Sequence, residues 1–194
     1  MISAIVLAAG TSSRMGQKNK LLLSFKGRTF IQQVVEQLLQ SKVGEVIVVL
    51  GHEGDEIEQL LSQNKVRFAI NDNYKSGMTS SIQVGVKASD LQSDGYLICL
   101  SDMPFLMTED YNQMCAIVTG NREIGVPFYR HHKGNPVFFS KHFKNDILDH
   151  KAPEGCRAIV QNNAQYIIKV HFDHPRILRD IDTMEDYEKA GLTP

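Results

Sequence analysis

The sequence lacks tryptophan, has few cysteines, carries no excess of charge of one sign and contains no long apolar run. Its three cysteines, Cys99, Cys115 and Cys156, form no C-x-x-C pair. This argues against a disulfide framework or a zinc knuckle and favours a reducing, cytoplasmic setting. The formal net charge of −1 argues against a broad basic surface for nucleic acid. No apolar run reaches the ~20 residues that span a bilayer, and no basic leader precedes Ile2. We therefore expect neither a membrane-spanning segment nor a targeting signal.

The composition is that of an ordinary globular protein. Of the 194 residues, 42% are apolar and 22% are charged, which favours neither disorder nor a fibrous architecture. The chain is long enough to bury a full core, and no repeat, linker or low-complexity stretch divides it. We therefore expect a single domain over residues 1–194.

Strand-like and helix-like segments alternate in the first half. Short, β-branched runs typical of buried parallel strands occupy residues 2–8, 46–50, 66–70 and 96–100. Between them, residues 30–39, 57–61 and 82–86 have helical spacing, and Thr29 followed by Gln32 resembles a capping box. This order predicts right-handed crossovers and a mainly parallel sheet with helices on both faces. Ligands in such sheets bind beyond the carboxyl ends of the strands.

The second half is more mixed. Residues 123–127 and 136–139 are predicted as strands around a turn at Lys133-Gly134-Asn135, and residues 166–171 as another strand. We therefore expect some antiparallel pairing in this half.

A glycine loop follows the first strand. Small residues at Leu7-Ala8-Ala9-Gly10 allow backbone N–H groups to surround an anion, and Arg14 and Lys20 can neutralise a triphosphate. The spacing fits neither the dinucleotide fingerprint nor the P-loop. An ordinary tight strand-to-helix turn with solvated Arg14 and Lys20 is the alternative interpretation.

The longer string L-A-A-G-x-S-x-R-M-G, followed by lysine and a leucine run, resembles the signature of the MobA-like NTP transferase family. These enzymes transfer nucleotidyl groups to the molybdenum cofactor, and the cytidylyl-transferring members are the most similar. The resemblance extends over nearly the whole chain. Further segments that match family motifs are Gly77-Met78-Thr79-Ser80-Ser81, Ser101-Asp102-Met103-Pro104, Gly134-Asn135-Pro136 and Asp180-Ile181-Asp182-Thr183 with Glu185-Asp186.

Three positions depart from the family pattern. Three residues instead of two separate Gly16 from the lysine, so Lys18 and Lys20 compete for the phosphate role, and the following leucines favour Lys20. Ser101 replaces glycine, and Asn135 replaces a histidine that would contact the acceptor.

Asp102 directly follows the strand over residues 96–100, which places a carboxylate at the carboxyl edge of the sheet. Mg²⁺ prefers oxygen ligands and commonly takes one or two carboxylates together with substrate phosphates. Asp182 is the second candidate ligand, with Asp180 close behind. By themselves Asp102 and Thr183 could equally cap helices or turns.

The resemblance implies a Rossmann-like three-layer α/β/α nucleotidyltransferase fold and transfer of CMP from CTP to a molybdopterin-type cofactor, with Mg²⁺ and release of pyrophosphate. Arg14, Lys20 and Asp102 would be catalytic. The nucleotide would contact Leu7, Ala8, Ala9, Gly10, Arg14, Lys20, Gly77, Ser81 and Asp102, and the metal Asp102 and Asp182. In this family Ala9 accompanies cytidine use, whereas glycine accompanies guanosine use.

Other functions remain open at this point. Guanylyl transfer or sugar-phosphate nucleotidyl transfer would keep the chemistry and change a substrate. A non-catalytic protein that binds the finished cofactor for a molybdenum hydroxylase client would need no triphosphate site.

Overall fold

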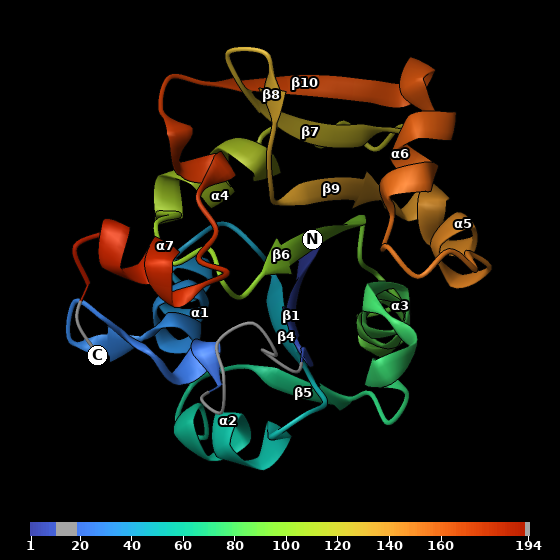
Figure 1. Cartoon of the computed structure of the whole chain (residues 1–194). Coiled ribbons are helices and arrows are strands. Elements are labelled where there is room, and N and C mark those ends of the chain that lie inside the picture. Colours follow the sequence, from blue (N-terminus) through green and yellow to red (C-terminus); the bar gives the residue numbers. More distant parts are fainter. Residues whose placement is uncertain (11–18, 193–194) are drawn as a thin grey trace.

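The computed structural model describes residues 1–10 and 19–192. Within these residues one sheet forms the centre of the molecule, with the strand order β10-β7-β9-β6-β1-β4-β5 and the short β8 paired to β7 (Figure 1). Its strands are β1 (Ile2–Ala8), β4 (Glu45–Leu50), β5 (Arg67–Ile70), β6 (Gly95–Leu100), β7 (Ile124–Tyr129), β8 (His132–Lys133), β9 (Val137–Ser140) and β10 (Ile167–Phe172).

The sheet is mainly parallel, as predicted. β1 pairs in parallel with β4 and β6, β4 with β5, and β7 with β10. β9 runs antiparallel to both β6 and β7, and β8 runs antiparallel to β7. The antiparallel pairing expected in the second half is therefore confirmed, and β9 joins the two parallel parts of the sheet.

Helices cover both faces of the sheet, which confirms the three-layer arrangement (Figure 1). One face packs against α1 (Phe30–Leu39), α2 (Gly54–Leu60) and α4 (Thr108–Cys115), and the other against α3 (Met78–Ala88), α5 (Lys144–Leu148) and α6 (Arg157–Asn162). Side chains alternate across the strands, so Ala4 and Val6 enter the first core and Ile5 the second. Burial of this apolar area from both sides is the main stabilising force of the fold.

The helix α1 shows how local sequence sets an element. Thr29 accepts a hydrogen bond from the backbone N–H of Gln32, and the Gln32 side chain accepts one from the backbone N–H of Thr29, which is the predicted capping box. Phe30, Val34 and Leu38 lie on the face that meets the core and are buried. The same spacing that predicted the helix therefore also orients it.

One predicted turn is placed differently. The tight turn lies between Tyr129 and His132, which pair across β7 and β8, so Lys133 belongs to a strand rather than to the turn. Arg130 takes a positive φ of 54° there. The sequence signal at Gly134-Asn135 instead marks the point where the chain leaves β8, and the N–H of Asn135 donates to the carbonyl of Ile177 (3.0 Å).

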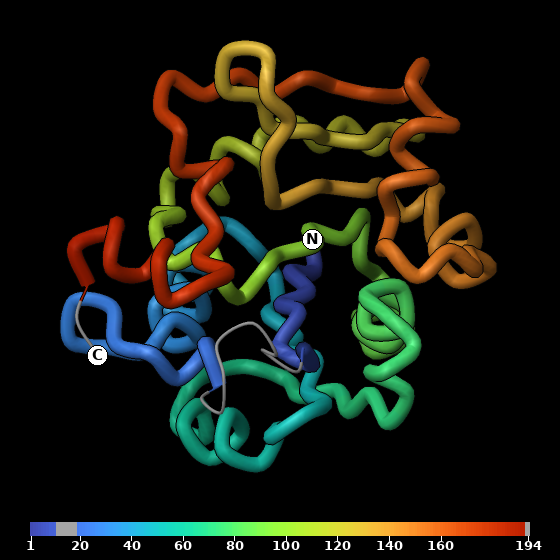
Figure 2. Tube along the Cα trace, in the orientation of Figure 1, coloured from blue at the N-terminus to red at the C-terminus, as the bar shows by residue number. Residues whose placement is uncertain are grey.

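A smaller apolar cluster joins residues 23–30 to the C-terminal part of the described chain. The hairpin of β2 (Ser24–Phe25) and β3 (Arg28–Thr29) packs against α7 (Met184–Lys189). The hydroxyl of Tyr187 donates to the carbonyl of Ser24 (2.7 Å). Figure 2 shows α7 beside the segment that begins near residue 19, so the C-terminal part of the chain lies next to the region that follows the glycine loop.

Candidate functional site

The carboxyl ends of β1 and β6 lie side by side. Leu7 pairs with Leu100, and the Ser101 hydroxyl donates to the carbonyl of Leu7 (2.5 Å). From β1 the chain moves to β4 and β5 on one side and then returns to β6 on the other. This reversal is the topological switch point, where parallel sheets bind their ligands. Ser101, which replaces the family glycine, joins the two strand ends here.

A cavity of about 580 Å³ opens at this point. The residues that line it are Leu7, Ala9, Gly10, Lys20, Leu21, Tyr74, Lys75, Gly77, Met78, Ser81, Leu100, Ser101 and Asp102. Seven of the residues that we predicted for nucleotide binding thus surround one cavity of a size suited to a small-molecule ligand. The predicted Ala8 does not line this cavity, because its side chain is buried in the core on the other side of β1.

A short 3-10 helix, η2 (Lys20–Leu22), positions Lys20. The Asn19 side chain caps it by accepting from the N–H of Leu21 (3.0 Å), and Leu21 packs into the core. The Lys20 backbone is therefore fixed on both sides, and its side chain extends into the cavity. The competing Lys18, like the predicted catalytic Arg14, lies outside the described residues.

Lys20 joins two carboxylates that lie far apart in the sequence. Its Nζ donates to Oδ2 of Asp102 (2.6 Å) and to Oδ1 of Asp182 (2.8 Å). A backbone hydrogen bond from Ile181 to the carbonyl of Asp102 (3.0 Å) holds the two chain segments together. Both aspartates that we predicted as metal ligands thus meet at one cationic group.

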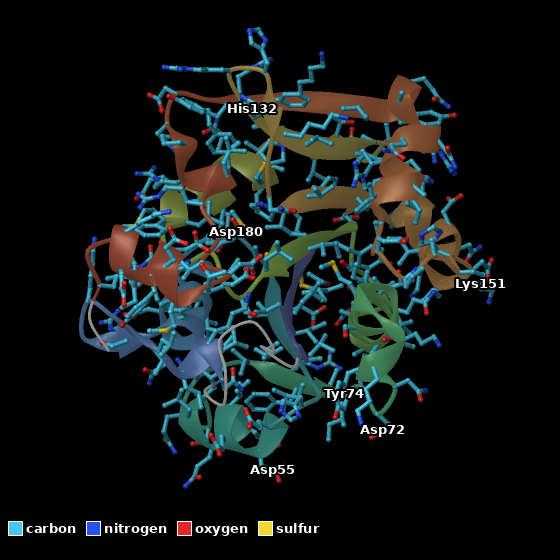
Figure 3. The ribbon with its side chains drawn as sticks, viewed as in Figure 1. Asp55, Asp72, Tyr74, His132, Lys151 and Asp180 are labelled. Atoms are coloured by element: carbon cyan, nitrogen blue, oxygen red, sulfur yellow. The ribbon has the colours of Figure 1, made fainter. Side chains whose placement is uncertain are left out.

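The electrostatics of this group are strongly coupled. Burial opposes the charged form of Lys20, but the carboxylate of Asp102, and then that of Asp182, outweigh it and raise the pKa of Lys20 above its ordinary value. Burial and the charges of Asp102 and Asp182 raise the pKa of Asp180, although Lys20 opposes the shift. Figure 3 shows Asp180 on the segment that leads to α7. Among the described residues, the charges of three carboxylates, those of Asp102, Asp180 and Asp182, act on the ammonium of Lys20 or on one another.

The donor set fits a divalent cation that prefers oxygen ligands. Oδ1 of Asp102 is buried and has no hydrogen-bond partner among the described residues. A buried carboxylate oxygen without a partner is costly and is commonly satisfied by an ion. No group of three or more His, Cys, Asp and Glu side chains in residues 1–10 and 19–192 forms a complete metal site. A metal here would therefore need ligands from a bound substrate, as Mg²⁺ commonly does.

The amino-terminal end of α3 forms another wall of the cavity. Gly77 has a φ of 108° and precedes the helix, and Ser81 lies one turn further on. Asn71 donates its amide to the hydroxyls of Ser80 and Ser81 (both 2.9 Å). Ser80 in turn donates to the carbonyl of Gly77 (2.8 Å). The Ser81 oxygen accepts from Asn71, and its O–H can still act as a donor.

Sequence reasoning missed Tyr74 and Lys75, which line the cavity from the 3-10 helix η3 (Tyr74–Ser76). Figure 3 shows Tyr74 between β5 and α3. Tyr74 stacks near His52, with ring centroids 6.0 Å apart. The sequence feature that could have indicated them is the aromatic and basic pair Tyr74-Lys75, which lies just before the predicted segment at Gly77.

A second pocket of about 290 Å³ adjoins the first, because Met78 and Leu100 line both. Its polar lining consists of Lys133, Asn135, Glu154, Arg157 and Gln161. Asn135, the third departure from the family pattern, therefore faces a pocket beside the main cavity.

The comparisons with known proteins agree with this geometry. The family model of the MobA-like NTP transferase domain matches residues 4–167. The molybdenum cofactor cytidylyltransferase of Escherichia coli is 26% identical over 190 residues, which cover 97% of this chain and 95% of that protein. A probable molybdenum cofactor guanylyltransferase of Methanosarcina acetivorans is 31% identical over 113 residues, 55% of this chain and 48% of that protein.

A solved structure has the same fold. A nucleotidyl transferase from Methanothermobacter thermautotroptrophicus superimposes with a TM-score of 0.87 at 25% identity and covers 98% of this chain and 95% of its own. Because the family model spans most of the chain and the predicted loop, lysine and aspartate meet at one cavity, the protein belongs to the MobA-like NTP transferase family and is a nucleotidyltransferase.

Proposed function

We propose that the protein transfers CMP from CTP to the terminal phosphate of a molybdopterin-type molybdenum cofactor, with Mg²⁺ and release of pyrophosphate. The convergence of Lys20, Asp102 and Asp182 beside the glycine loop is the observation that carries this proposal. Lys20 and Asp102 supply a cation for a triphosphate and a carboxylate for a metal at one cavity, and the Asp182 carboxylate binds the same ammonium.

The triphosphate would lie over the loop at Ala9-Gly10. The backbone after β1 is exposed at Gly10, and a Cβ built there would meet no atom of residues 1–10 and 19–192 within 4 Å. Backbone N–H groups of such a loop bind phosphate oxygens. Lys20 would turn from the carboxylates toward the phosphates, and Asp102 and Asp182 would hold Mg²⁺. When bound, the metal would neutralise the negative charge that develops on the phosphate oxygens.

The reaction needs no protein nucleophile. A phosphate oxygen of the acceptor attacks the α-phosphorus of CTP, the new P–O bond forms, and the bond to the bridging oxygen of pyrophosphate breaks. The protein contributes position and charge: the loop and α3 fix the nucleotide, and Lys20 stabilises the oxygens on which charge develops. We assign the second pocket to the acceptor because it shares Met78 and Leu100 with the first and carries Lys133 and Arg157 for an anionic group.

Ala9 supports cytidine rather than guanosine. Ala9 lines the cavity, and its methyl packs against Gly51, where a built Cβ would lie 2.7 Å away. In the resembled family, alanine at this position accompanies cytidine use. Guanylyl transfer stays a second candidate, because a relative named as a guanylyltransferase matches half of the chain.

The test is pyrophosphate release from CTP, GTP and ATP in parallel, with and without molybdenum cofactor, and with Mg²⁺ present or chelated. Release that is selective for CTP and requires both cofactor and metal supports the proposal. GTP-selective release would assign guanylyl transfer. Cofactor binding without release from any nucleotide, in folded protein, would instead identify a cofactor carrier for a molybdenum hydroxylase.

A further inference from the structure

The segment 147–156, which connects α5 to α6, depends on α3 for its position. Figures 1 and 2 show it passing the end of α3. Residues 149–156 contain neither helix nor strand, so the backbone polar groups of this stretch need partners elsewhere. Two α3 side chains one turn apart, Thr79 and Gln83, supply them.

Gln83 forms hydrogen bonds with backbone carbonyls at the end of α5. Its amide nitrogen donates to the carbonyls of Ile147 (3.0 Å), Leu148 (3.0 Å) and His150 (2.9 Å). The last carbonyls of a helix lack partners within the helix. Because an amide –NH2 group has two hydrogens, at least one of them is shared between two of these carbonyls. Gln83 thus links the end of α5 to the start of the irregular stretch.

Thr79 forms hydrogen bonds with the backbone of the following turn. Its buried hydroxyl donates to the carbonyl of Ala152 and accepts from the N–H of Gly155 (3.0 Å). The fit between helix and segment is close at both glycines: a Cβ built on Gly77 would lie 2.7 Å from the carbonyl oxygen of Pro153, and one on Gly155 would lie 2.9 Å from the sulfur of Met78. The segment therefore rests directly on the first turn of α3.

The same helix faces the two pockets. Gly77 and Ser81 line the first cavity, whereas Thr79 and Gln83, offset by two residues, point toward the segment. The segment then continues into Glu154, Cys156 and Arg157, which line the second pocket. Side chains two residues apart on a helix lie on different faces, so α3 holds both binding regions at once.

We infer that Thr79 and Gln83 are positioning residues for the second pocket, acting through segment 147–156 rather than by touching a ligand. If the second pocket binds the anionic acceptor, as the proposed function requires, Thr79 and Gln83 affect the affinity for the acceptor but not the affinity for the nucleotide. Loss of either side chain leaves the Gly77 and Ser81 side of α3 intact and releases the wall that carries Arg157.

The experiment compares Thr79→Val and Gln83→Met with Thr79→Ser, which keeps the hydroxyl, and with Lys87→Ala, an exposed change on the same helix. The first measurement needs no turnover: peptide mass spectrometry follows iodoacetamide labelling of Cys156 in the folded proteins. Loss of one or two hydrogen bonds should speed labelling by about three- to tenfold in Thr79→Val and Gln83→Met, and leave both other variants at the wild-type rate.

The second measurement is the KM for acceptor and for CTP. We expect the acceptor KM to rise about three- to tenfold while the CTP KM stays within twofold of wild type, with Thr79→Ser behaving as wild type. Unchanged Cys156 labelling, or equal rises in both KM values, would overturn the inference. If the wild type shows no acceptor-dependent turnover, the proposed function fails, and the labelling result still decides whether α3 positions the pocket wall.

Discussion

The ammonium of Lys20 lies 2.6 Å from Oδ2 of Asp102, whereas Oδ1 of the same carboxylate is buried and has no hydrogen-bond partner among the described residues. Asp182 binds the same ammonium. If Asp102 and Asp182 hold a divalent cation, as we propose, that cation and the Lys20 ammonium would repel each other and compete for the same two carboxylates. Substrate phosphates give Lys20 an alternative partner, so nucleotide and metal should bind together.

Replacing Lys20 by methionine tests this exchange. We expect Lys20→Met to lower kcat by about 10²–10³, as loss of one charge-stabilising donor does. In the absence of nucleotide, however, it should bind Mn²⁺ about tenfold more tightly, because a cation no longer competes for Asp102 and Asp182. Titration of Mn²⁺ followed by electron paramagnetic resonance measures this, with Lys87→Met as the control. Turnover lost without tighter metal binding would contradict the exchange.

The sequence allowed prediction of those parts of the site that depend on local signals. The loop after β1, Lys20 before the leucines and Asp102 after β6 each follow from neighbours in the chain, and all three line one cavity. The place of Asp182 beside Asp102 followed only from the family resemblance and not from its neighbours in the chain, because it depends on the backbone hydrogen bond between Ile181 and Asp102. Such a long-range pairing has no periodicity or spacing to reveal it.

The same distinction holds for the fold. Helical spacing and a capping box located α1, and apolar runs located the strands of the first half. The insertion of β9 between β6 and β7 could not be predicted, because strand order depends on packing between distant residues such as Tyr96 and Phe139. Likewise, the three carbonyls to which Gln83 donates lie more than sixty residues away.

We expect the titration of Asp180 to make the free energy of unfolding depend on pH. Because its pKa is raised in the folded state, its neutral form stabilises the fold below the ordinary aspartate pKa of about 3.9. That contribution is lost as the pH rises through the elevated folded pKa. The Asp180→Asn variant has no such loss, so without metal it should be more stable than wild type at pH 7 and equal to it near pH 3.

The gain in stability of Asp180→Asn at pH 7 should be small, because the Asp180 side chain is exposed and water screens its charge. We expect at most the ~0.2–1 kcal/mol of an exposed charge pair. Urea denaturation of both proteins at several pH values, with a chelator present, gives the difference directly. A variant that is less stable at pH 7 would show that Asp180 makes a favourable contact that the carboxylate repulsion does not outweigh.

Gly85 allows α3 to approach the sheet. A Cβ at this position would lie 2.3 Å from Cγ2 of Ile5 and 3.1 Å from Cγ2 of Val49, both buried. Gly85→Val should therefore destabilise the protein by about 1–3 kcal/mol through overpacking, despite the better helix propensity of valine. Thermal unfolding of this variant is compared with that of Lys87→Val, which is exposed on the same helix. Equal melting temperatures would show that the contact can relax.

Two Arg–Asp pairs in the described chain have similar contact distances but differ in burial and in the number of hydrogen bonds that the aspartate accepts. Asp110 is 2% exposed and accepts from Nε and Nη2 of Arg176 (both 2.9 Å), and also from the N–H of Met107. Asp146 is 39% exposed and accepts from Arg122 (2.9 Å). Both pairs have short contacts, so the surrounding solvent should decide their effect on stability.

Removing the buried carboxylate leaves a guanidinium and a backbone N–H without their acceptor. Asp110→Ala should lower the free energy of unfolding by about 3 kcal/mol, the lower end of the range for a broken buried pair, because Arg176 is itself 35% exposed. Asp146→Ala should cost no more than ~1 kcal/mol. Chemical denaturation of both variants at low and high salt measures the difference. Equal losses would show that contact distance, rather than burial, determines the strength of these pairs.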